Sequence, residues 1–286
     1  MEVRDGSVAA VTADDDGTLV ARNVQPGTSA SAAADAVRAV VDGPALVGVA
    51  VRDPLDHAIA DLVAAAAGAA GAPKAPRVIT RGTAVALGEQ WRGAARDATH
   101  VVALTAGDCV HAGIVIDGRP FEGAHRMAGA AGWLALNPVE REDYRKVGCL
   151  EAEIGASGIV RRLIWRLKSG DMSRVLDRAG GNMSAITVGH IFDAARDGDG
   201  VAISVVRDTA RYVGMAIGNL VAIVDPDVVV LGGVIAEAAD LLVEPARTEA
   251  MRRMPASVSS AVRIVAGELG DEAGALGAAR AAMLAR

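Results

Sequence analysis

Asp108, Cys109 and His111 bring a carboxyl group, a thiol and an imidazole together in one short segment of the sequence. A thiol beside an imidazole can serve as a nucleophile, because the imidazole can take up the thiol proton. Alternation along a strand would put Cys109 and His111 on the same face. Residues two positions apart seldom bring the sulfur in line with the ring nitrogen, so we favour Cys109 as a small buried residue. Asp108 and His111 are candidate ligand-binding residues.

Two further polar features raise the question of a metal site. The run from Asp14 to Asp16 is acidic, but it lacks the ligand spacing and the closing glutamate of a calcium loop. His57 has no set of zinc ligands at the usual spacing around it. We therefore expect a solvated turn at the acidic run and no bound metal at either place.

The composition argues against several classes of function. The 286 residues are 51% hydrophobic but only 2% aromatic, and the net charge is -6. Nucleic acids attract basic surfaces and stack on aromatic rings, so we expect no nucleic-acid binding by this chain. The longest apolar stretch is interrupted at Asp225, so we expect no membrane span. The two cysteines cannot form a disulfide framework and suit a reducing compartment, which predicts a cytoplasmic protein.

Helices and strands alternate along the chain, as in α/β proteins. Asp16-Gly17 and Asp117-Gly118 predict hairpin turns between β-prone runs. The expected strands span 45–51, 76–80, 227–233 and 263–268, and the expected helices span 28–43, 53–71, 82–96, 159–176, 188–224 with an interruption at 197–200, and 271–286. A new β-rich block begins near residue 100. We therefore expect two lobes, 1–100 and 101–271, with a C-terminal helix over 272–286 that packs back on the first lobe.

Several motifs appear in an order that closely resembles the ROK family of repressors, open reading frames and sugar kinases. They are "TRGTAVALGE", "HAGIVIDG", "EGAHRMAGAAGW", "GCLE", "YVGMAIGNLVAIVDPDVVVLGGVI" and "RIVAGELGDEAGALGAARAAM". The resemblance implies the two-lobed actin-like, sugar-kinase and Hsp70-type fold, which is ribonuclease H-like. It also implies a homodimer and a small-molecule site in a cleft between the lobes.

The catalytic base of the ROK sugar kinases is an aspartate in an Asn-Asp-Ala-Asn stretch, and the matching residues here run from Thr80 to Thr83. Arg81 therefore takes the place of the base. A guanidinium stays protonated at physiological pH, so it cannot accept the proton of a sugar hydroxyl. We expect Arg81 either to point to solvent, which we favour, or to hold an anionic ligand, and we keep Thr83 as a candidate ligand-binding residue.

The phosphate-binding loops of the kinases are also altered. Their Asp-x-Gly-Gly-Thr loop aligns with residues 2–6, where Arg4 and Asp5 replace bare backbone and add a like charge, and their Gly-Thr-Gly-x-Gly loop aligns with residues 107–111. Close approach of backbone N–H groups to phosphate requires glycine. On the adenosine side Gly232 and Gly233 are kept, although Val234 replaces the third glycine. These changes predict weak or absent ATP binding.

The resemblance also locates the family's sugar and zinc ligands. Its sugar-binding glutamate aligns with Ala130, and its histidine for sugar and zinc aligns with Trp133. Only Cys149 remains of the zinc thiolates, because Glu142 and Tyr144 replace two others. Structural zinc takes four N or S ligands, so we expect no zinc. We keep His125 and Trp133 as candidate ligand-binding residues, although we favour Trp91 and Trp133 as core or interface anchors.

The combined losses favour a catalytically inactive ROK-fold protein, a regulatory pseudokinase that binds a small ligand or a protein partner without a cofactor. A sugar or cyclitol kinase that uses Asp108 or Asp53 as its base is the first alternative. An enzyme built on Asp108, Cys109 and His111 is the second. No helix-turn-helix precedes the first predicted strand, so we expect no repression of DNA by this chain alone.

Overall fold

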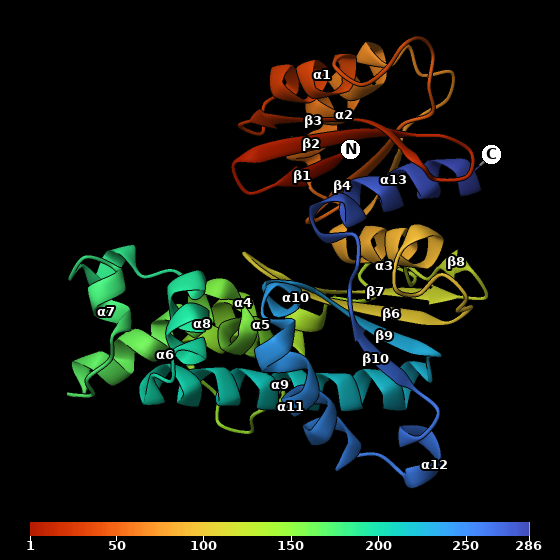
Figure 1. The fold of residues 1–286 in the computed structure, drawn as a ribbon. Helices are drawn as coiled ribbons and strands as arrows, with labels where there is room; N and C mark the ends of the chain where they lie inside the picture. Colours follow the sequence, from red (N-terminus) through yellow and green to blue (C-terminus); the bar gives the residue numbers. More distant parts are fainter. Residues whose placement is uncertain (286) are drawn as a thin grey trace. The chain divides into compact units, whose positions relative to one another are not determined.

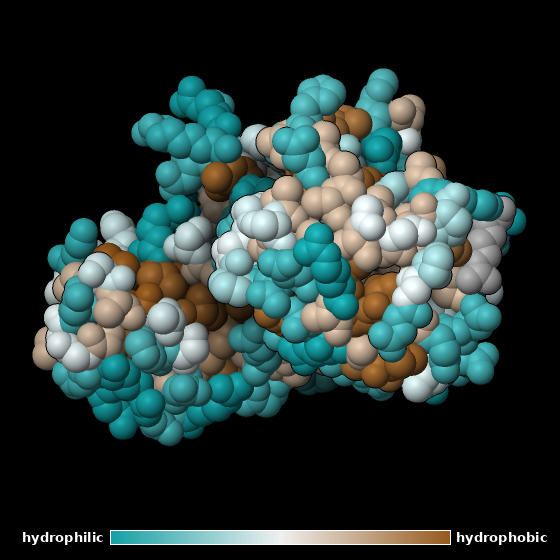
Figure 2. Space-filling view, turned by 90° about the horizontal axis from the view of Figure 1, so that it is seen from above, coloured by the Kyte–Doolittle hydropathy of each residue, from teal (hydrophilic) through white to brown (hydrophobic). Residues whose placement is uncertain are grey.

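A computed structural model describes residues 1–285 as two compact units. Unit 1 comprises Met1–Ala103, Ala112–Gly129 and the described part of Gly267–Arg286, and unit 2 comprises Leu104–His111 and Ala130–Ala266. Hydrophilic side chains dominate the face in Figure 2, where hydrophobic atoms form separate patches. No helix within residues 1–285 has the length and apolar character that a membrane span needs.

The first sheet of the fold lies in unit 1 and has the strand order β3-β2-β1-β4-β5. Its strands are β1 (Glu2–Arg4), β2 (Ser7–Ala13), β3 (Leu19–Pro26), β4 (Gly48–Val51) and β5 (Arg77–Thr80). The pairs β1/β2 and β2/β3 are antiparallel, whereas β1/β4 and β4/β5 are parallel, with Val51 opposite Thr80. This register brings the start of β1 close to the end of β5, where the next helix begins.

Helices cover both faces of this sheet (Figure 1). The helical elements are α1 (Ala30–Arg38), η1 (His57–Ile59), α2 (Ala60–Ala69), α3 (Arg81–Arg92), η4 (Gly270–Glu272) and α13 (Ala273–Leu284). Helices α1 and α2 bury alanine and valine side chains against one face, and α13 packs on the other face and on α3. Trp91 of α3 lies against Gly17 and beneath the guanidinium of Arg280, which makes it a packing residue.

The second sheet has the order β10-β9-β6-β7-β8. Its strands are β6 (Val101–Ala106), β7 (Val110–Ile116), β8 (Arg119–Pro120), β9 (Val228–Gly233) and β10 (Arg263–Ala266). Strands β7 and β8 are antiparallel, and β9 and β10 are parallel. Asp117 and Gly118 have positive φ, as the predicted hairpin turn requires.

Unit 2 is rich in helices. They are η2 (Ala131–Trp133), α4 (Glu142–Val147), α5 (Cys149–Ile154), α6 (Ala156–Lys168), α7 (Val175–Arg178), η3 (Met183–Ala185), α8 (Val188–Arg196), α9 (Gly200–Val224), α10 (Val234–Glu237), α11 (Ala239–Met251) and α12 (Ala256–Ser259). The long α9 packs against α5, α6, α8 and α11. Its N-cap Asp199 accepts from the backbone N–H groups of Val201 and Ala202, as expected for a helix that starts after an acidic turn.

Several predicted helices differ from the observed ones, and the one predicted over 82–96 ends at Arg92. The helix predicted over 159–176 is wrong, because α6 ends at Lys168 and Gly170, at φ 100°, is in a conformation that cannot continue a helix. The helix predicted over 28–43 ends at Arg38. The one predicted from Asp53 starts later, because the Asp53 carboxylate accepts from the backbone N–H of Leu55 and forms a turn.

The Asp14 carboxylate similarly accepts from the N–H groups of Asp16 and Thr18, so the acidic run is a turn as expected.

Candidate functional site

Arg81 is the first residue of α3, and its surroundings follow from the start of this helix. The Thr80 hydroxyl caps α3 by accepting from the N–H of Thr83 at 3.2 Å and donates to the Thr83 hydroxyl at 2.8 Å. Thr83 is buried, so its side chain belongs to the cap. The Arg81 Nε donates to Oε1 of Glu2 at 3.3 Å. Arg81 is therefore paired with a protein carboxylate. Our favoured prediction, that Arg81 points to solvent, was wrong.

Glu2 is a buried carboxylate that is held by two guanidinium groups. Its other oxygen, Oε2, accepts from Nε of Arg4 at 2.9 Å. On its other side it lies against α13, where a Cβ atom added to Gly274 would stand 2.5 Å from the carboxyl carbon of Glu2. A buried carboxylate needs such charge compensation. The residues that align with the kinase base and with the first acid of the phosphate loop thus form an ion pair within unit 1.

The turn between β6 and β7 uses much of its own hydrogen-bonding capacity. The N–H of Gly107 donates to the carbonyl of Cys109 at 3.2 Å, and the N–H of Val110 donates to Oε2 of Glu151 at 2.8 Å. Asp108 lies exposed at the tip of the turn. A phosphate group needs several converging N–H groups, and here two of them already have protein acceptors. The N–H groups of Gly107 and Val110 are therefore engaged within the protein.

Cys109 and His111 are in direct contact within this turn. Nε2 of His111 lies 2.9 Å from Sγ of Cys109, and the thiol side chain is buried. Our expectation that residues two apart would not align was wrong. Cys109 is the last residue of the turn and His111 lies in β7, and the imidazole reaches back to the sulfur. The expectation that Cys109 is a small buried residue is confirmed.

The glycine pair at the end of β9 has a packing role in unit 2. Gly232 is buried, and Gly233 has a φ of 63° that disfavours other residues. A Cβ atom on Gly233 would stand 2.1 Å from the carbonyl oxygen of Ala106 in β6. Close contact between strand ends is therefore sufficient to account for this glycine, without a nucleotide.

His125 and Trp133 are both exposed. The predicted ligand-binding residues are divided between the two units. Unit 1 contains Arg81, Thr83 and His125, and unit 2 contains Asp108, His111, Trp133, Gly232 and Gly233. Trp133, in the short η2 helix, is 58% exposed, so the core half of our core-or-interface prediction is wrong and an interface role stays a prediction.

The region that aligns with the family's zinc ligands contains a different arrangement. Tyr144 and Cys149 are buried together with Ala152, and the exposed Glu142 pairs with Lys146. The Tyr144 hydroxyl donates to Oε1 of Glu153 at 2.5 Å. Burial, followed by this hydrogen bond, raises the pKa of Tyr144 above its usual value of 10. No group of three potential metal ligands occurs within the described part of the chain, so zinc does not fit here.

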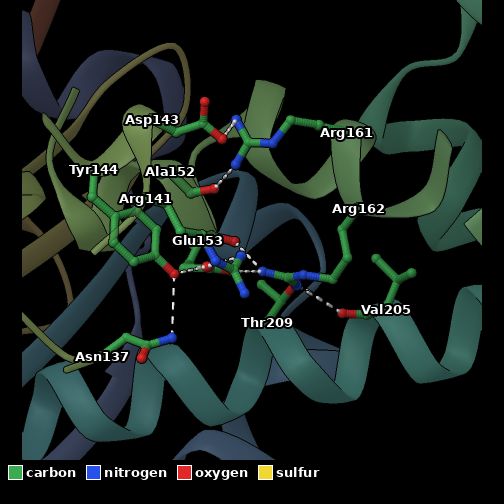
Figure 3. Close-up of polar contacts among 10 residues, drawn as sticks. All are labelled: Asn137, Arg141, Asp143, Tyr144, Ala152, Glu153, Arg161, Arg162, Val205 and Thr209. Carbon is green, nitrogen blue, oxygen red and sulfur yellow. Dashed lines mark hydrogen bonds and ion pairs between the residues drawn. The ribbon is translucent and has the colours of Figure 1, made fainter. Parts of the chain in front are cut away.

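Glu153 is the centre of a polar cluster that we define as Arg141, Tyr144, Glu153, Arg162 and Thr209. Arg162 donates to Oε2 of Glu153 at 2.6 Å, to the Glu153 carbonyl at 2.7 Å and to the Thr209 hydroxyl at 3.1 Å. Arg141 lies 3.4 Å from Oε1 of Glu153. Figure 3 shows Tyr144 and Arg162 pointing to Glu153 from two sides. The sequence analysis missed this cluster, because its members come from α4, α5, α6 and α9 and from the loop before α4.

Comparison with known proteins identifies the family. The sequence model of the ROK family matches residues 74–285. The chain belongs to the ROK family. Glucokinases of Halalkalibacterium halodurans and Thermotoga maritima are 32% and 33% identical to it over 197 residues each, which are 67% and 68% of this chain. These matches span 58% and 62% of the glucokinases, less than two thirds of their length.

Other ROK relatives are regulators, and solved ROK structures share the fold. A putative xylose repressor of Caldicellulosiruptor is 30% identical over 67% of this chain and 48% of its own length. A ROK glucokinase from Streptomyces griseus in complex with glucose and AMPPNP superposes with a TM-score of 0.82 at 23% identity, covering 99% of this chain and 98% of that one. A ROK hexokinase from Thermus thermophilus has a TM-score of 0.76 at 26% identity, covering 99% and 97%. The chain has the mixed α/β, actin-like ATPase fold of ROK sugar kinases.

Proposed function

We propose that this ROK-family chain is a regulator that binds a small molecule or a protein partner and does not transfer phosphate. The single observation that carries the proposal is the ion pair between Arg81 and Glu2. A general base must accept the proton of the attacking hydroxyl, and a guanidinium, which stays protonated, cannot do so. The pair with Glu2 shows that the Arg81 guanidinium is engaged within the protein. The family relatives include sugar-responsive repressors by name, which makes a binding role compatible with the fold.

The β6–β7 turn and the polar cluster support the same proposal. Two N–H groups of the turn donate to protein acceptors, and Asp108 would bring a like charge toward a phosphate. Tyr144, which aligns with one of the family's zinc thiolates, donates to Glu153, and this contact is compatible with a fold held without zinc. Like many ROK proteins, the chain is proposed to act as a homodimer in the cytoplasm, and sedimentation of the purified protein would test the dimer.

The test combines turnover and binding. We expect no glucose-dependent consumption of ATP–Mg²⁺ in a coupled assay, and no heat from AMPPNP in a calorimetric titration. ATP-dependent phosphorylation of glucose by the purified chain would overturn the proposal. Arg81→Asp restores a carboxylate at the position of the base, but the phosphate loops stay altered, so we expect this variant to remain inactive.

A sugar kinase that uses Asp108 is the second candidate. It is favoured by the glucokinase relatives and by the position of Asp108, which is exposed and, among residues 1–285, makes no ion pair or side-chain hydrogen bond. This candidate predicts that any phosphorylation activity disappears in Asp108→Asn and persists in Asp53→Asn. Inactivity of the unmodified chain toward glucose, mannose and inositol would remove it.

A further inference from the structure

The faces of two helices in unit 2 line an open pocket of about 500 Å³ beside the polar cluster. On α6, Trp165 and Arg166 lie three and four residues after Arg162, and on α9, Met215 lies four residues after Arg211 and three after Tyr212. Residues at this spacing share one face of a helix. The pocket has the volume of a small-molecule site.

Arginine dominates the charge of this pocket. Arg141, Arg162, Arg166, Arg211 and Arg253 line it, whereas Glu153 and Asp208 are its only lining carboxylates among the described residues. Both Arg141 and Arg162 share Glu153, so this carboxylate leaves one of the two positive charges uncompensated. The whole chain carries a net charge of -6, which makes a concentration of arginine at one place notable for ligand binding.

Arg211 is the guanidinium that is free to bind. It is exposed, and no ion pair or side-chain hydrogen bond of Arg211 is found in the described part of the chain. Arg166 and Arg253 differ, because they pair with Asp171 and Glu249. Guanidinium groups bind carboxylates and phosphates with two parallel hydrogen bonds.

The same pocket exposes apolar surface. Trp165 is 67% exposed, and Tyr212, Met215 and Leu136 contribute further apolar atoms. Tyr212 lies under the guanidinium of Arg162, with 5.7 Å between the guanidinium carbon and the ring centroid, and this contact fixes both groups. Figure 3 shows how Glu153 and Thr209 hold Arg162 in place. A planar ligand can therefore stack on Trp165 while its charge reaches the arginines.

We propose that this pocket binds a small organic anion that carries a carboxylate or phosphate group on a planar apolar body. The charged group lies between Arg211 and Arg141, and the planar body stacks on Trp165. The site deepens the proposed function by naming a ligand class. It does not depend on the loss of phosphotransfer, because an active kinase could equally bind an anion here.

The first experiment titrates the full chain with four probes at low ionic strength. They are phenyl phosphate, benzoate, inorganic phosphate and phenol. We expect phenyl phosphate, benzoate or both to bind at least tenfold more tightly than phenol, and inorganic phosphate to bind more weakly than phenyl phosphate. Added salt weakens the binding of an anion to exposed arginines, so we expect affinity to fall at 0.5 M NaCl. Equal affinity for phenol and for the anions would overturn the proposal.

The second experiment uses matched variants on α9. Arg207 lies one helical turn before Arg211, is also exposed and does not line the pocket. We expect Arg211→Gln to weaken the binding of the preferred anion about tenfold, as for the loss of a charge-assisted hydrogen bond, and Arg207→Gln to leave it unchanged. Equal losses in the two variants would show attraction by net charge alone and would overturn the site.

The fluorescence of Trp165 locates the ligand. We expect the bound ring to change tryptophan emission in the unmodified chain, and Trp165→Phe to remove this change although calorimetry still detects binding. A change in emission that persists in Trp165→Phe would place the ligand near Trp91 or Trp133 and would overturn the site. Failure of these tests with no glucose phosphorylation would leave the proposed function standing, so the two proposals fail separately.

Discussion

The Arg81 Nε lies 3.3 Å from Oε1 of Glu2, although the two residues are 79 positions apart in the sequence. Arg4 contacts the other oxygen of the same carboxylate. Arg81, Arg4 and Glu2 therefore form one charge network within unit 1. The two guanidinium groups compensate the charge of the buried Glu2 carboxylate.

The first prediction concerns the stability that Arg81 provides. We expect Arg81→Met to lower the free energy of unfolding by about 1–3 kcal/mol. This is less than the loss expected on breaking a fully buried ion pair, because Arg81 is partly exposed and Arg4 still pairs with Glu2. Denaturation in urea measures the loss. In Glu2→Gln the carboxylate is absent, so adding Arg81→Met to it should cost much less.

The control for this prediction is Arg38→Met, which removes an exposed pair with Asp35 on α1. An exposed pair contributes about 0.5 kcal/mol or less. If Arg81→Met cost no more than Arg38→Met, the pair with Glu2 would not be a stabilising contact.

The second prediction concerns Gly274 in α13. Alanine is the better helix former, yet a Cβ atom at this position would collide with the buried carboxyl group of Glu2. We expect Gly274→Ala to lower the midpoint of thermal unfolding, with a net cost of about 1–3 kcal/mol from the displaced ion pair.

Gly68→Ala is the matched control, because Gly68 lies within α2 and a Cβ atom added to it would have no heavy atom within 4 Å outside its own helix turn. We expect this change to stabilise the protein by about 0.5–1 kcal/mol. Equal effects of the two glycine substitutions would show that α13 does not press on Glu2.

The third prediction concerns Asp199, the N-cap of α9. Burial acts to raise its pKa, but hydrogen bonds from the backbone of Ala202, Arg174 and Val201 and from the Ser173 hydroxyl hold the pKa below its usual value of 3.8. A carboxyl group whose folded pKa is depressed stabilises the fold above its unfolded pKa and loses that contribution as the pH falls through the folded value.

We expect Asp199→Ala to cost about 1–3 kcal/mol at pH 7, for a capping carboxylate that accepts several N–H groups. The difference between the unmodified chain and this variant should shrink as the pH is lowered below about 4, which follows from the usual value of 3.8. Urea denaturation at pH 7 and at pH 3 measures both. Ser29→Ala removes the cap of α1, which does not titrate in this range, so its cost should be the same at both pH values.

The fourth prediction concerns the phenol group of Tyr144. Burial and the hydrogen bond to Glu153 raise its pKa above the usual value of 10, so the neutral phenol stabilises the fold below pH 10 and this contribution is lost as the pH rises further. Absorbance titration at 295 nm should show one tyrosine that ionises later than free tyrosine. This late step should be missing in Tyr144→Phe and should persist in Tyr212→Phe.

The fifth prediction concerns the reactivity of the two buried cysteines. The imidazole of His111 can take up the thiol proton of Cys109, whereas Cys149 is packed among Tyr144 and Ala152. We expect iodoacetamide to modify Cys109 faster than Cys149 in the folded protein, and His111→Ala to slow the reaction of Cys109 about tenfold, because the thiolate is the reacting species. Mass spectrometry of the peptides distinguishes the two sites, and equal rates in the unmodified chain would contradict the contact.

The amino-acid pattern predicted much of the fold and less of the site. The hairpin at Asp117-Gly118 and the strand that leads into α3 were confirmed, because turn residues and hydrophobic runs act locally. The prediction of one continuous helix over 159–176 was wrong, because the hydrophobic pattern continues past Gly170 although the helix ends at Lys168. The ion pair of Arg81 and the cluster around Glu153 were not predicted, since the partner of a charged side chain depends on strand register and helix packing.

The sequence by itself determined the family and predicted, from the resemblance, that Arg81 stands where the ROK sugar kinases have their base. Those facts require no coordinates, because a guanidinium cannot accept a proton in any fold. Only the tertiary structure decided what the replaced residues contact. It joined Arg81 to Glu2 and Arg162 to Glu153, because the first sheet brings the start of β1 close to the end of β5 and because α5, α6 and α9 pack together.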